Sequence, residues 1–72
     1  MSDRSMHLRH LEQAERHIAQ GERHIASQEQ IVEDMTRLGQ DTIQARQLLE
    51  NFYLSQTQHI SHRDRILREL EE

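Results

Sequence analysis

The chain has 72 residues, of which 33% are hydrophobic and 31% are charged, and its net charge is −4 with the histidines neutral. A chain of this length forms one small domain and has too few apolar residues to surround a deep cavity. Because enzyme pockets occupy several hundred cubic ångströms, we expect no catalytic residues and no cofactor.

The charge balance and the missing residue types narrow the possible partners. Thirteen acidic residues oppose nine arginines, and lysine is absent, whereas a surface that neutralises a nucleic-acid backbone needs excess positive charge. There is no cysteine and no proline, so no disulfide framework exists and nothing interrupts a helix. No apolar run approaches the roughly 20 residues of a membrane span, and residues 1–9 lack the apolar core of a signal peptide. We therefore expect a cytoplasmic protein that binds neither nucleic acid nor membrane.

The first predicted element is a helix over residues 5–38. The letters ERHIA occur at residues 15–19 and again at residues 22–26, seven positions later. Such an echo is typical of a long helix that packs against other helices. Counting outwards from it gives two rows of core positions with a spacing of seven. One row is Leu11, Ile18, Ile25 and Val32, and the other is Ala14, Gly21, Gln28 and Met35.

The second predicted element is a helix over residues 42–70, after a turn at residues 39–41. Gly39 can adopt the left-handed conformation that ends a helix. Asp41, with Gln44 three residues later, is a typical start for the next helix. A connection this short joins two antiparallel helices into a hairpin, which makes residues 1–72 a single helical-hairpin domain.

The centre of the turn also predicts which residues face each other. If the hairpin is centred on Gln40, residue numbers that add to about 80 lie opposite one another. Gly21 is then expected opposite His59 and Ile60, where a small residue makes room for larger ones.

The apolar stripe is too wide for one neighbouring helix to cover. Adjacent apolar pairs, such as Leu48 with Leu49 and Phe52 with Tyr53, broaden it near the turn. A second hairpin would cover the extra width, which predicts an all-α homodimer in which two antiparallel hairpins form a four-helix bundle. The expected interface residues are Leu11, Ile18, Ile25, Val32, Met35, Leu48, Leu49, Phe52, Tyr53, Ile60 and Leu67.

The six histidines are the candidates for site chemistry. His10, His17 and His24 form a row seven residues apart beside the core positions, and His59 and His62 are three apart. Imidazoles that share a helical face can share a metal ion, so His17, His24, His59 and His62 are the candidate metal ligands. No HExxH motif, cysteine or inward carboxylate triad accompanies them, and the simpler interpretation is a polar edge to the helix seam. Histidine also changes charge between pH 5 and 8, which makes a pH response an alternative.

Several segments resemble a known group of proteins. They are GERHI at residues 21–25, GQDT at residues 39–42, Ala45-Arg46 with Leu48-Leu49, and Arg63-Asp64-Arg65. In these segments the chain resembles the short uncharacterised helical-hairpin proteins of rhizobial and other alphaproteobacterial genomes. The resemblance covers most of the chain and implies a bacterial cytoplasmic protein, without an activity or ligand residues to carry over.

Together these features predict a non-enzymatic, self-associating helical hairpin that acts as an interaction or scaffold module for a protein partner still to be identified. One alternative is a histidine-based metal-binding or pH-sensing protein, which stoichiometric metal binding would favour. Another, by fold analogy alone, is a small RNA-modulating four-helix dimer, which a salt-sensitive RNA complex would favour.

Overall fold

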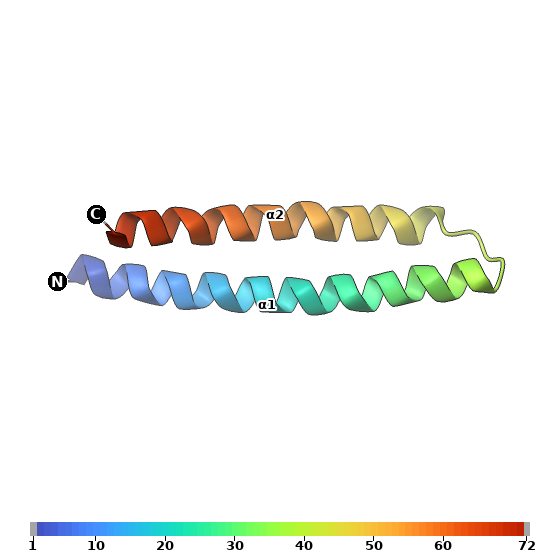
Figure 1. Cartoon of the computed structure of the whole chain (residues 1–72), viewed down its shortest axis with the longest axis horizontal. Helices are drawn as coiled ribbons and strands as arrows, with labels where there is room; N and C mark the ends of the chain where they lie inside the picture. The colour runs from blue at the N-terminus through green and yellow to red at the C-terminus, as the bar shows by residue number, and fades with distance from the viewer. Residues whose placement is uncertain (1, 72) are drawn as a thin grey trace.

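The computed structural model describes residues 2–71 as two α-helices joined by a short connection (Figure 1). Helix α1 spans Ser2–Arg37 and helix α2 spans Ile43–Glu71. The helices lie antiparallel and side by side, so the start of α1 and the end of α2 are at the same end of a rod of 57 × 14 × 14 Å. The predicted all-α class and the two-helix hairpin are confirmed.

Helix α1 begins earlier than the predicted residue 5. Nothing in its first turn breaks a helix, and Asp3 places a negative charge near the helix N-terminus, where the helix dipole favours it. At the same end of the rod, His7 Nε2 lies 2.9 Å from Glu69 Oε2 of α2. This contact between the helices lies close to the two termini.

The connection between the helices, residues 38–42, is set by a glycine and an aspartate. Gly39 has a φ of 73°, and its N–H donates to Thr36 O at 3.1 Å while Gln40 N–H donates to Met35 O at 2.9 Å. This pair of bonds is a Schellman motif, which satisfies carbonyls that the helix end leaves free. Asp41 Oδ1 accepts the N–H of Ile43 at 3.0 Å, so Asp41 does satisfy a free N–H at the start of α2, while Thr42 O accepts the first helical bond from Arg46.

The connection has two residues more than the predicted turn, and α1 extends beyond the start of α2 (Figure 1). The hairpin register is shifted accordingly. His17 lies beside His59, with ring centroids 5.4 Å apart, and these numbers add to 76. The prediction that Gly21 lies opposite His59 and Ile60 is therefore wrong, because the side chain of Gln56 covers Gly21.

The core between the helices is a single narrow strip. Its buried apolar residues are Ala14, Ile18, Val32 and Ile66. Of the predicted interface residues, Ile18 and Val32 lie within this strip, and five others are half-buried beside it. Those five are Leu11, Ile25, Met35, Leu49 and Phe52.

Two buried glutamines connect α1 to α2. Gln28 Nε2 donates to Ala45 O at 3.0 Å, and Gln56 Nε2 donates to Ile18 O at 2.9 Å. One bond runs from α1 to α2 and the other from α2 to α1. A buried amide must find a partner, and a shift of either helix along the other would separate both pairs. The glutamines therefore specify the register.

Replacing Gly39 tests its left-handed conformation. A Cβ at this position would meet nothing within 4 Å, so the cost of a side chain is a backbone cost. Gly39→Val should lower the free energy of unfolding by about 1–2 kcal/mol, because L residues resist positive φ. Gly39→Asn should cost less, since asparagine tolerates this conformation. Urea unfolding at fixed protein concentration, followed by circular dichroism, measures both, and equal stability of all three proteins would contradict the assignment.

Candidate functional site

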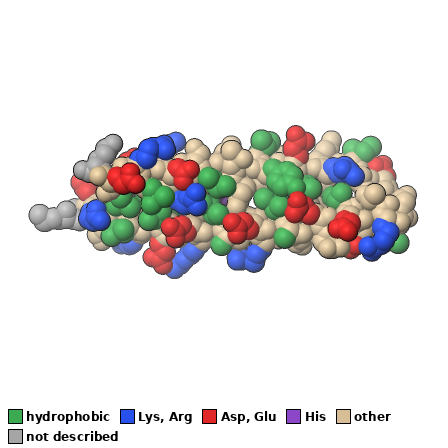
Figure 2. Space-filling view, viewed as in Figure 1, with side chains coloured by type: hydrophobic (Ala, Val, Ile, Leu, Met, Phe, Trp, Pro, Cys, Tyr) green, Lys and Arg blue, Asp and Glu red, His purple; other side chains and the backbone are tan. Residues whose placement is uncertain are grey.

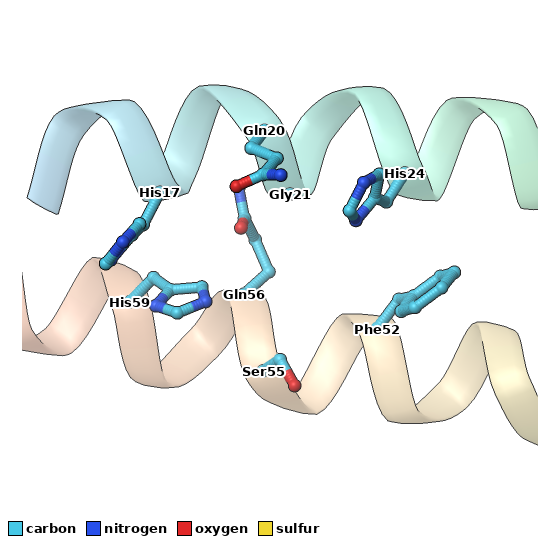
Figure 3. A pocket seen from close by; sticks show the side chains of 8 residues that line it. All are labelled: His17, Gln20, Gly21, His24, Phe52, Ser55, Gln56 and His59. Carbon is cyan, nitrogen blue, oxygen red and sulfur yellow. The ribbon is translucent and has the colours of Figure 1, made fainter.

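Two grooves run beside the helix seam, on opposite faces of the rod. The first, which we call the histidine groove, has a volume of about 240 Å³. Its lining side chains come from both helices (Figure 3). They are His17, Gln20, Gly21, His24, Phe52, Ser55, Gln56 and His59.

The four candidate metal ligands are distributed along this face in separate contacts. His17 pairs with His59, whereas the ring of His24 lies 5.6 Å from that of Phe52. His62 lines an adjoining hollow together with His17. Within residues 2–71, no group of three or more histidine, cysteine or carboxylate side chains is placed to hold a metal ion. The register explains this arrangement, because it sets Phe52 beside His24.

The floor of the histidine groove depends on Gly21. A Cβ on this residue would lie 1.9 Å from Gln56 Oε1 and 2.8 Å from Gln56 Cδ. Glycine is therefore what allows the Gln56 amide to enter the seam and reach Ile18 O. Gln56 Oε1 is buried and has no hydrogen-bond partner among the described residues. The predicted packing role of Gly21 stands, with a different residue opposite it.

The second groove, which we call the tyrosine groove, is a hollow of about 410 Å³ whose lining includes Glu29, Val32, Arg46 and Leu49. Tyr53 of α2 lies next to it, where its hydroxyl donates to Glu29 Oε2 at 2.6 Å. A spacing of seven residues places Ile60 and Leu67 in one row with Tyr53. The same spacing extends the Glu29 row through Glu22 and Glu15 to Leu8.

The remaining predicted interface residues lie exposed on the single hairpin. They are Leu48, Tyr53, Ile60 and Leu67. Sequence reasoning did not select Leu8, which is also exposed. Counting back by sevens from Glu29 identifies it, since the same repeat that gave the core rows also gives the rows beside them.

The histidines are distributed unevenly around the rod. Helix α1 lies below α2 in Figure 1 and above it in Figure 3, while each helix keeps its own horizontal direction in both figures, so the two views show opposite faces. Figure 2 has the orientation of Figure 1 and shows hydrophobic side chains along the rod, bordered by carboxylates and arginines, with almost no histidine. The face with the histidine groove is the other one. The face in Figure 2 is thus apolar with a charged border, and the histidines that line the groove lie on the opposite face.

Comparison with known proteins gives no relative for this chain: the sequence matches no protein-family model, and no curated protein or solved structure matches it significantly. The resemblance to rhizobial hairpin proteins stays a prediction. Over the described residues, neither helix combines the length and the apolarity that crossing a membrane requires.

The contact between Tyr53 and Glu29 predicts how the phenol titrates. The hydrogen bond to the Glu29 carboxylate, then partial burial, then the carboxylate's negative charge raise the pKa of Tyr53 above its usual value of about 10. Because the folded state favours the neutral phenol, this contribution to stability is present below about pH 10 and is lost as pH rises through the folded pKa. Absorbance titration of this single tyrosine should show a lower pKa in Glu29→Gln, and identical titration curves would contradict the contact.

The contact between Gly21 and Gln56 predicts a context-dependent effect of alanine. In a Gln56→Ala background, Gly21→Ala should raise the free energy of unfolding by about 1 kcal/mol, the usual gain in a helix interior. With Gln56 present, the same change displaces the amide from Ile18 O, so the gain should vanish or reverse. A double-mutant cycle by urea unfolding measures the difference, and equal effects in both backgrounds would show that the two residues are independent.

Proposed function

We propose that this chain is a non-enzymatic helical hairpin that pairs with a second copy of itself and serves as an interaction or scaffold module. The observation that carries this proposal is the distribution of apolar side chains. Among the described residues, four apolar side chains are buried in the single hairpin, whereas ten large hydrophobic side chains are exposed. Burying such side chains against a second copy would supply stabilisation that one helix pair lacks.

The surface area supports the same proposal. The accessible surface of the chain is 5732 Å², whereas a compact monomer of its 8.7 kDa mass exposes about 4,700 Å². The radius of gyration is 16.5 Å, compared with about 11 Å for a compact domain of this length. The excess of roughly 1,000 Å² is close to the area of about 800 Å² that each partner buries in a standard protein interface. A second copy side by side would therefore bring the surface per chain into the ordinary range.

The quality of the hairpin core supports a need for a partner. Among the described residues no large side chain is completely buried, and two of the six buried residues are glutamines. A hydrogen bond contributes about 1 kcal/mol in net terms, less than burial of a large apolar side chain. The buried glutamines thus define the register of the two helices, but the core as a whole buries little apolar surface.

The chemistry of the exposed side chains supports binding over catalysis. The exposed residues Leu8, Ile60 and Leu67 provide apolar area but carry no acid, base or nucleophile. This composition is suited to covering by another apolar surface.

Mass and melting measurements test the proposal. Light scattering at tens of micromolar chain should give twice the 8.7 kDa chain mass. The melting temperature should rise with protein concentration, because dimer formation is coupled to folding by mass action. A measured mass of one chain, together with cooperative melting at a temperature that does not depend on protein concentration, would show that the hairpin is stable alone. That result would overturn the proposal.

A further inference from the structure

We infer that the second copy docks on the face that carries the tyrosine groove, with α2 of one hairpin packed against α2 of the other. This inference rests on the proposed self-association and adds which of the two faces is covered. The candidate surface is the row of Tyr53, Ile60 and Leu67 on α2, extended by Leu8 on α1.

The row is apolar over two heptads and accessible on the single hairpin. Tyr53 is 43% exposed, Ile60 37%, Leu67 38% and Leu8 47%. All four side chains are exposed on the single hairpin, so a second copy would remove apolar area from water at each of these positions.

The polar group within this row already has a partner. The Tyr53 hydroxyl donates to Glu29 of its own chain at 2.6 Å, so covering the ring would not leave an unpaired donor. The other carboxylates of the Glu29 row, Glu22 and Glu15, belong to α1. Contact between two α2 helices therefore keeps these charges at the rim, where interfaces are ordinarily polar and wet.

The histidine groove is less suited to a dry interface. Its lining includes Gln20, Ser55 and three histidines, whose polar atoms would each need a partner after leaving water. The exposed apolar residues Ile31 and Leu48 belong to the heptad rows of this face but lie toward the connection. We therefore assign the partner to the face shown in Figure 2 and leave the histidine groove solvated.

The row also has the symmetry that a closed dimer needs. Ile60 lies midway between Tyr53 and Leu67, seven residues from each. An antiparallel pair of α2 helices related by a two-fold axis near Ile60 would place Tyr53 beside the partner's Leu67, and the reverse contact would follow by symmetry. An aromatic ring would then face an aliphatic side chain on both sides of the axis.

Arginine substitutions distinguish the two faces. Ile60→Arg should weaken the dimer by about 30-fold or more, as loss of an interface hot spot does, and should shift the mass to one chain at tens of micromolar. Leu54→Arg is the matched control on the same helix, because Leu54 is 59% exposed and lies outside the heptad row of Tyr53, Ile60 and Leu67. Leu48→Arg tests the histidine face.

The outcomes separate this inference from the proposed function. If Ile60→Arg is monomeric while Leu54→Arg and Leu48→Arg remain dimeric, the result supports docking on the face of Tyr53, Ile60 and Leu67. Loss in Leu48→Arg with an intact dimer in Ile60→Arg would overturn the choice of face while self-association stands. A monomeric wild-type chain would overturn both.

Cysteine cross-linking provides a second readout that needs no loss of stability. The chain has no cysteine, so Ile60→Cys introduces a single thiol. A disulfide requires Cα atoms within about 7 Å, which the proposed axis provides at this position. Mild oxidation should give covalent dimers of Ile60→Cys and leave Leu54→Cys and Leu48→Cys largely monomeric on a denaturing gel. More rapid cross-linking of Leu48→Cys than of Ile60→Cys would overturn the assignment.

Discussion

Two helical cylinders can contact each other along only one line, and this constraint governs the whole molecule. In a rod 57 Å long and 14 Å thick, each helix has one face toward its neighbour and most of its circumference toward solvent. Heptad spacing keeps that contact line continuous, because residues seven apart return to nearly the same side of a helix. The rows on either side of the contact line need not have the same composition. In this chain one side has a row of histidines, and the other has rows that contain Tyr53, Leu67 and the carboxylates of Glu15, Glu22 and Glu29.

The seam is held in register largely by hydrogen bonds. Gln28 and Gln56 each place a side-chain amide against a backbone carbonyl of the opposite helix. Apolar contacts along a uniform seam tolerate sliding, whereas these bonds have a fixed partner. Gly21 contributes to the same hydrogen bond, because only a residue without Cβ leaves space for the Gln56 amide. The polar pairs thus contribute specificity where the narrow apolar strip contributes stabilisation.

Most of the fold could be predicted from the sequence because its signals are local. The heptad echo gave α1 and its core rows, and Gly39 and Asp41 gave the break between the helices. The register could not be predicted in the same way, since it depends on how far α1 extends beyond the start of α2. An error of three to four in the sum of facing residue numbers placed Gln56, rather than the expected His59, against Gly21. The glutamines at core positions were the available signal, because a buried amide requires a partner on the facing helix.

The candidate site was predictable in its residue types but only partly in its arrangement. The histidine row on α1 follows from spacing alone, and Tyr53 and Ile60 were among the predicted interface residues, whereas their exposure on the single hairpin comes from the structure. Which histidine meets which residue of α2 depends on the register, and so the four candidate ligands were grouped more closely than the structure places them. The bond between Tyr53 and Glu29 joins residues 24 apart in sequence, and no local pattern predicts it.

The seven-residue rows also restrict how this rod can change in length. Adding or removing one residue within a helix rotates everything beyond it by about 100°, which would carry one row into the place of another. A tolerated insertion must therefore comprise a whole heptad, and a matching heptad in the facing helix is needed to keep the two ends together. The rod is in this sense built in units of about 10 Å, and relatives with the same two faces should differ in length by such steps.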